Sequence, residues 1–65
     1  MLLTERERNI LFYLAQGYKN IEIGKILNIS VHTVKAHLET IYDKLEVTNR
    51  VKAVIKAVKK NYIDI

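Results

Sequence analysis

The stretch NIEIGKILNISVHTVKAHLETIYDKL, residues 20–45, has the pattern of two helices joined by a tight turn. In its second half, apolar residues recur at steps of three and four. At about 100° per residue they form a single stripe along a helix. The stripe consists of Val31, Val34, Leu38, Ile41 and Leu45. Ser30, just before it, is a good N-cap, because its hydroxyl can accept a hydrogen bond from a free backbone N–H. We therefore expect a helix at about residues 31–45 that buries one face and offers the other to a long ligand.

The first half of the stretch predicts a shorter helix. Asn20 is a suitable cap, and Glu22 in the first turn suits the positive end of the helix dipole. The expected buried face consists of Ile23, Ile26 and Leu27.

Gly24 lacks a side chain at a point where another helix must come close, and it costs about 0.5–1 kcal/mol relative to alanine in a helix. Asn28 is expected to end the helix, since asparagine tolerates a left-handed backbone. The spacing from Gly24 through Asn28 to a buried Val34 is that of a helix-turn-helix. That geometry can place the second helix, residues 31–45, in a major groove of DNA.

The chain begins with a predicted capping box, formed by Thr4 and Glu7. Ile10, Leu11 and Leu14 supply the core stripe of the helix that follows, and Gly17 is a natural stop. For Glu7 two interpretations stay open, and they are compatible. It acts as a cap alone, or it also forms a partly buried ion pair with a base later in the chain, Arg50 or Lys44.

A last helix is expected at about residues 49–61, capped by Thr48 or Asn49. Its apolar side consists of Val51, Val54, Ile55, Val58 and Tyr62, and its polar side carries Lys52, Lys56, Lys59 and Lys60. A lysine-rich face is most often solvated, although it can also lie against phosphate or a membrane surface. Ala53 and Ala57 form a separate edge of small residues. That edge reflects either helix propensity or the close approach of another helix.

Composition places these elements in one all-α domain of 65 residues with a small core. The absence of cysteine excludes a disulfide framework and a thiolate metal site, and no apolar run approaches the length of a membrane span. No signal-peptide pattern is visible, so we expect an intracellular, cytoplasmic protein. The net charge of +4 and the pI of about 9.5 favour an anionic partner.

Enzymatic and metal chemistry find no support in the sequence. His32 and His37 are five residues apart, so on a helix they point in different directions, and no cysteine joins them. Neither a glycine-rich phosphate loop nor a nucleophile elbow is present, and no acid–base constellation can be identified. We expect no catalytic residue, no metal and no cofactor.

The chain resembles the C-terminal DNA-binding domain of LuxR-type (LuxR/NarL/FixJ) bacterial transcription regulators, in one unbroken register from residue 3 to residue 54. The residues that carry the resemblance are Leu3-Thr4-Glu5-Arg6-Glu7, Gly17, Asn20-Ile21-Glu22-Ile23, Leu27, Ile29-Ser30, Thr33-Val34-Lys35-Ala36-His37, Ile41, Lys44-Leu45, Val47, Arg50 and Ala53-Val54. The resemblance implies a four-helix domain whose third helix enters the major groove, usually as a dimer on repeated half-sites. Gly24 and Glu46 depart from it, because alanine and glycine are common there. The turn at Glu46 is therefore expected to be strained or of another type.

By resemblance, Lys35, Ala36 and Glu39 face base edges. Lysine can donate to guanine, the alanine methyl can contact thymine, and glutamate can accept from cytosine. Glu39 also repels phosphate, and its other interpretation is a solvated residue paired with Lys35. The positions that the resemblance places near the DNA backbone are Asn20, Ser30, Val31, Thr33 and Lys44.

The resemblance also implies a homodimer on DNA through the last helix, with Ala53, Ala57 and their neighbours at the interface. The expected function is sequence-specific binding of double-stranded DNA in transcription regulation, with RNA polymerase as a further candidate partner. The chain would be the output domain of a response regulator or a free-standing regulator of the family. The alternative is a helical protein–protein interaction module that does not bind DNA.

Overall fold

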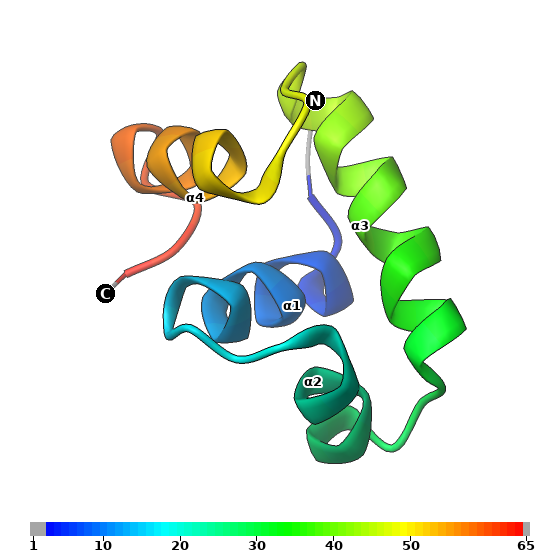
Figure 1. Cartoon of the computed structure of the whole chain (residues 1–65). Coiled ribbons are helices and arrows are strands. Elements are labelled where there is room, and N and C mark those ends of the chain that lie inside the picture. Colours follow the sequence, from blue (N-terminus) through cyan, green and yellow to red (C-terminus); the bar gives the residue numbers. More distant parts are fainter. Residues whose placement is uncertain (1–2, 65) are drawn as a thin grey trace.

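The computed structural model describes residues 3–64, and every regular element within that range is a helix. The elements are α1 (Glu5–Ala15), α2 (Asn20–Leu27), α3 (Val31–Leu45) and α4 (Arg50–Lys59). α1 packs against all three other helices and lies between α4 and α2, while α3 runs along one side of this stack (Figure 1). The expected all-α, four-helix architecture is confirmed.

One core, shared by all four helices, holds the fold together. Its fully buried members are Ile10, Leu11, Ile23, Val34, Ile41, Ala53 and Ala57, and Leu3, Leu14, Leu38, Leu45 and Ile63 are nearly so. The predicted buried faces of α1 and α3 are therefore confirmed, except that Val31 is only half-buried. In α2 the prediction for Ile26 is wrong, because its side chain is 45% exposed. α2 is too short to bury more than the stripe of Ile23 and Leu27.

A residue with a left-handed backbone follows each helix within two positions, and the four residues are Gly17 (φ 94°), Asn28 (φ 58°), Glu46 (φ 57°) and Asn61 (φ 60°). After each one, the next N–H donates to the carbonyl five residues earlier, at 2.8–3.2 Å in all four cases. This is the Schellman arrangement, which satisfies carbonyls that the helix end leaves free. Gly17 and Asn28 end their helices as predicted. Glu46 gives the strained turn that was one of the two expected outcomes of its departure from glycine. In the left-handed region the Cβ atom of a glutamate comes too close to the following carbonyl oxygen.

Helix starts follow the sequence at three of four places. Thr4 and Glu7 form the capping box, with each side chain accepting from the other's N–H. Ser30 accepts from the N–H of Thr33 at 3.1 Å, and Asn49 accepts from that of Lys52 at 2.9 Å.

The prediction of Asn20 as a cap is wrong, because Asn20 is the first residue inside α2 and Lys19 precedes it with an extended backbone. The Glu22 carboxylate accepts from the N–H of Lys19 at 2.7 Å, so this helix start does not need the amide of Asn20.

Gly24 faces the backbone of the turn between α2 and α3. A Cβ atom built at Gly24 would lie 2.7 Å from the carbonyl oxygen of Ile29, closer than real Cβ contacts come. The close partner is therefore the turn itself. Glycine lets α3 begin directly against the end of α2, and this contact offsets the cost of glycine in a helix.

Ala53 and Ala57 lie on the inner face of α4, and neither has any exposed surface. Another helix does approach them closely, but it belongs to the same chain, because α4 packs only on α1 and α3. The expectation that these two side chains form a dimer contact is therefore wrong. The apolar residues that α4 presents to solvent are Val51 and Ile55, which are 64% and 50% exposed.

Candidate nucleic-acid interface

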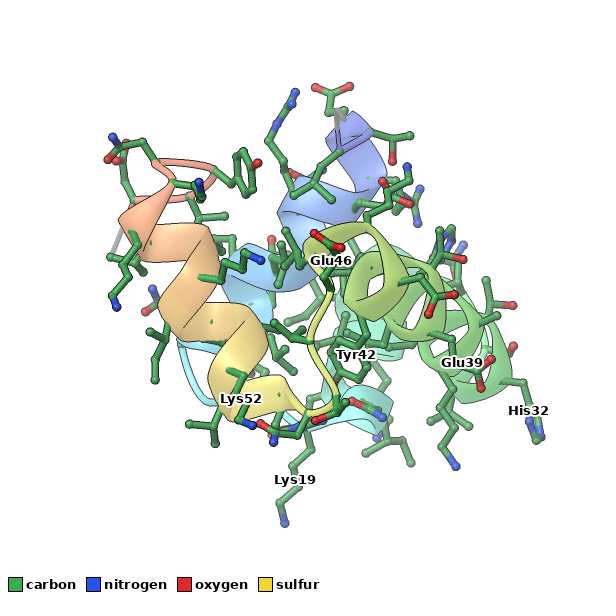
Figure 2. All side chains as sticks on the ribbon, turned by 90° about the horizontal axis from the view of Figure 1, so that it is seen from above. Lys19, His32, Glu39, Tyr42, Glu46 and Lys52 are labelled. Atoms are coloured by element: carbon green, nitrogen blue, oxygen red, sulfur yellow. The ribbon has the colours of Figure 1, made fainter. Side chains whose placement is uncertain are left out.

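α3 divides sharply into a buried and an open face. Val34, Leu38 and Ile41 are buried, whereas Lys35, Ala36 and Glu39 between them are exposed. Figure 2 shows Glu39 and His32 on the outer side of α3, away from the other helices. Within residues 3–64, the side chains of Lys35 and Glu39 form no hydrogen bond, so the fold does not use them. The structure thus brings the three predicted base-contacting residues onto one accessible strip.

Two hydroxyl groups mark the beginning of α3. Besides capping the helix, the Ser30 hydroxyl lies 2.9 Å from that of Thr33, and both residues are exposed. Val31 between them is half-buried. Hydroxyls and free N–H groups at the start of a helix are suitable donors to phosphate. Ser30 and Thr33 thus lie at the beginning of the exposed strip, and their predicted contact with phosphate stays a prediction.

A shallow groove of about 210 Å³ opens beside the exposed strip. It lies where the first residues of α2 and α4 meet the middle of α3, and its lining consists of Asn20, Lys35, Leu38, Glu39, Tyr42 and Arg50. Two of these lining residues are joined directly, because the guanidinium of Arg50 donates to the amide oxygen of Asn20 at 2.6 Å. Lys19, next to the start of α2, extends away from the body of the molecule in Figure 2.

Lys44 lies apart from this surface. Its ammonium donates to the carboxylate of Glu7 at 2.7 Å, and the Glu7 side chain is only 5% exposed. Of the two bases considered for Glu7, the structure selects Lys44, and Arg50 pairs with Asn20 instead. The ammonium predicted near phosphate is thus engaged inside the molecule, at the opposite end of α3 from Ser30.

The environment of Glu7 combines two opposing effects on its acidity. Burial alone would raise the pKa of Glu7. The hydrogen bonds from Lys44 and from the backbone N–H of Thr4, together with the positive charge of Lys44, outweigh burial, so the pKa lies below the ordinary carboxyl value. Glu7 is therefore a buried charged group whose Oε1 atom accepts from both Thr4 and Lys44.

Other classes of site find no counterpart in the part of the chain that the structure describes. Over residues 3–64 no three histidine or acidic residues come close enough together to hold a metal ion. Within the same residues no helix has the length and apolarity needed to cross a bilayer. The concave surfaces are shallow and open.

Two structural features were missed by sequence reasoning. Arg50 was considered as a partner for Glu7 and as a residue of the family resemblance, and its place in the groove beside α3 was not predicted. A contact between residues 20 and 50 leaves no periodic signal in the sequence. Val51 and Ile55 were placed on the apolar side of the last helix, and their exposure was not predicted, because apolar residues on adjacent stripes of α4 cannot be ranked by burial without the tertiary packing.

Four helices with a left-handed turn between α2 and α3, and with a free polar face on α3, define a helix-turn-helix domain. Comparison with known proteins identifies the family of helix-turn-helix domains to which it belongs. Residues 1–57 match the family described as bacterial regulatory proteins, luxR family. This chain belongs to that family, and family membership makes it a domain of the DNA-binding transcription-regulator class.

Individual relatives agree with this assignment. The chain is 59% identical over 51 residues to the putative HTH-type transcriptional regulator YhjB of Escherichia coli (strain K12), covering 78% of this chain and 26% of that protein. It is 48% identical over 62 residues to the response regulator protein VraR of Staphylococcus aureus (strain Mu3 / ATCC 700698), covering 95% of this chain and 30% of that protein. The chain thus spans between a quarter and a third of these curated relatives.

Two solved structures superpose closely on the domain. The response regulator ChrA of a heme-sensing two-component system gives a TM-score of 0.94 at 43% identity, with 97% of this chain and 31% of that chain covered. The transcription factor GerE gives a TM-score of 0.93 at 33% identity, with 98% and 96% covered. Family membership and these relatives support DNA-binding transcription regulation as the class of function.

Proposed function

We propose that this chain is a sequence-specific DNA-binding domain that inserts α3 into the major groove of an operator. Lys35, Ala36 and Glu39 read base edges, with lysine directed to guanine, the alanine methyl to thymine, and the carboxylate to cytosine. Ser30, Thr33 and the backbone amide of Val31 anchor the start of α3 to phosphate. The domain acts on chromosomal DNA and hence in the cytoplasm.

The observation that carries this proposal is the free outer face of α3. The inner face of α3 is buried from Val34 to Leu45, and its outer face presents Lys35 and Glu39, whose side chains form no hydrogen bond within residues 3–64. A major groove is wide enough to admit such a helix. The net charge of +4 supplies the attraction for phosphate that binding of this kind requires.

We further propose that two copies pair on DNA through α4, with Val51 and Ile55 in place of the buried alanines. These side chains border a shallow, largely apolar groove of about 250 Å³ whose other lining residues include Leu14, Ala15 and Val54. Val51→Glu should abolish cooperative binding to a site with two half-sites and leave binding to one isolated half-site unchanged.

Two arrangements of the whole protein agree with the relatives. The domain is the output domain of a response regulator, as its 30–31% coverage of VraR and ChrA favours, or it stands alone, as its 96% coverage of GerE favours. We favour the output domain, because the matched region makes up only 26% and 30% of the curated relatives quoted above.

The test is selection from a pool of randomised duplexes at two salt concentrations, followed by sequencing. We expect enrichment of two short half-sites at a fixed spacing. Affinity should fall with salt with a log–log slope of about −0.9 for each phosphate neutralised. Binding without enrichment would remove base reading from the proposal. No binding to duplex even at low salt would overturn it in favour of a protein-interaction module.

The affinity of the Lys35→Ala variant for the selected duplex tests the proposed role of α3. If Lys35 reads a base, the variant should lose about 1–3 kcal/mol of binding free energy and its preference at one position. Lys59→Ala is the matched control, since it removes the same charge from an exposed position near the end of α4. A loss at Lys35 that is equal for all sequences would make this lysine a phosphate contact.

A further inference from the structure

The hydrogen bond between Arg50 and Asn20 connects two helices that do not otherwise pack. Asn20 is the first residue of α2 and Arg50 the first of α4, and their side chains meet at 2.6 Å. Among the described residues, no Cα atom of α2 lies within 8 Å of a Cα atom of α4. The contact is solvent-exposed. An exposed hydrogen bond of this kind adds little to stability, because water competes for both groups.

The chemistry of arginine fixes how the Asn20 amide is turned. A guanidinium has only donors, so the atom that faces it must be the amide oxygen. The amide nitrogen Nδ2, with its two protons, therefore points away from Arg50, and no acceptor within residues 3–64 receives them. Arg50 uses one of its two Nη atoms for Asn20 and keeps further N–H donors on the same exposed guanidinium.

These donors line the groove beside α3. Two cations, Lys35 and Arg50, and one carboxylate, Glu39, border it, so its formal charge is positive. Amide and guanidinium N–H groups that converge on an open, positively charged groove are suited to an oxyanion, and arginine binds phosphate oxygens through its fork of donors. This protein groove adjoins the exposed strip of α3. If α3 lies in the major groove as proposed, one DNA backbone strand would pass along it.

We propose that Asn20 and Arg50 together form a clamp for one phosphate of the DNA backbone. Arg50 is the positioning residue for Asn20, since it holds the amide by its oxygen and leaves Nδ2 directed outward as a donor. The guanidinium is the second donor to the same phosphate. This inference rests on the proposed DNA binding, and it assigns to Arg50 and to the amide orientation a role beyond joining two helices.

Asn20→Asp is the decisive variant. Aspartate has nearly the same shape and still accepts from Arg50, so the link between α2 and α4 is kept and the thermal midpoint should not fall. The Nδ2 donor is replaced by a carboxylate oxygen facing the phosphate. We expect the affinity for duplex to fall by about ten- to a hundredfold, equally for all sequences. The salt slope should become shallower by about 0.9, the equivalent of one phosphate.

Three measurements make the test specific. Arg50→Lys keeps the charge but loses the fork, and it should bind more weakly than wild type and more tightly than Arg50→Met. Lys59→Met controls for the loss of one positive charge away from the groove. In the ¹⁵N spectrum of the wild-type protein, the Asn20 Nδ2 protons should shift and exchange more slowly with water when a duplex is added, which a purely structural link would not produce.

The outcomes separate the clamp from the proposed function. If wild type binds duplex and Asn20→Asp binds equally well with the same salt slope, the clamp is refuted while DNA binding stands. A loss confined to particular base sequences would also refute it, because Asn20 would then contact a base. If wild type binds no duplex at low salt, the proposed function fails and the clamp fails with it.

Discussion

Two short contacts in the described part of the chain, residues 3–64, join side chains far apart in the sequence, and they lie in opposite surroundings. Lys44 meets Glu7 at 2.7 Å with the carboxylate almost fully buried, whereas Arg50 meets Asn20 at 2.6 Å in an open groove. The two distances are nearly equal, so they do not show which contact contributes more to stability. Burial does, because removing the cation from Glu7 leaves an unpaired charge in the interior, whereas water can replace the hydrogen bond between Arg50 and Asn20.

The difference divides the molecule into a part that maintains the fold and a part that is available for a ligand. Glu7 accepts from the N–H of Thr4 as well as from Lys44, so its hydrogen bonds join the start of α1 to the end of α3. The groove at Asn20 and Arg50 retains unused donors. We expect variants of the first contact to alter unfolding, and variants of the second to alter binding.

The largest effect is expected for Lys44→Met. It leaves the Glu7 carboxylate buried without a cation, which should lower the free energy of unfolding by about 2–4 kcal/mol, with Lys44's partial exposure reducing the penalty. Urea unfolding at neutral pH measures this. The double variant Glu7→Gln/Lys44→Met removes both charges and keeps an acceptor for Thr4, so it should recover most of the loss. A single variant as stable as wild type would contradict the assigned role of the pair.

Acid should weaken the same contact. The pKa of Glu7 is lowered in the folded state, so its contribution is fully present above the unfolded value of 4.5 and is lost as pH falls through the lower folded value. The urea midpoint should therefore decrease on acidification below about pH 4.5. The Glu7→Gln variant has no titratable group at this position, so its urea midpoint should decrease less on acidification. Identical pH profiles for the two proteins would show that Glu7 titrates equally in both states.

A smaller and opposite effect is expected for Glu46→Gly, at the same end of α3 as Lys44. Glycine adopts the observed φ of 57° without the clash of a Cβ atom, so stability should rise by about 0.5–1 kcal/mol. Glu46→Ala is the control, since it also removes the carboxylate but keeps the strained backbone. If alanine stabilises as much as glycine, charge at the helix end, not backbone strain, is the cause.

The smallest effect on stability is expected for Arg50→Met. The exposed link between α4 and α2 should contribute within about 0.5 kcal/mol, the range usual for surface substitutions. Thermal unfolding beside Lys44→Met gives the direct comparison of the two contacts. A loss as large as that of Lys44→Met would mean that the link at Asn20 holds the fold, and the proposed division of the molecule would be wrong.

Sequence patterns predict the local features of this fold well. Ser30, Thr4 and Asn49 start helices, and Gly17 and Asn28 end them, because capping depends on residues three to five positions apart. The inner face of α3 follows from its apolar period. Lys35, Ala36 and Glu39 were expected on its other face, and they lie there, although their contacts with bases stay a prediction.

Features that depend on contacts between residues far apart in the sequence could not be predicted in the same way. Asn20 has the side chain of a good cap, yet its amide is used by Arg50, thirty positions later. Ala53 and Ala57 form a stripe beside the larger residues of α4, and hydrophobicity alone favours the larger ones for the core. The structure reverses this order, because only small side chains let α4 approach its neighbours closely, and Val51 and Ile55 are left outside.

The free outer face of α3 has a consequence for how such a domain can diversify. Substitutions at Lys35, Ala36 or Glu39 leave the packing of Val34 and Leu38 untouched, so the stability threshold that constrains most mutations hardly applies there. Under the base reading that we propose for these three residues, duplicated copies can therefore acquire new operators one residue at a time without passing through unfolded intermediates. One scaffold can thus serve many separate regulatory circuits within a genome.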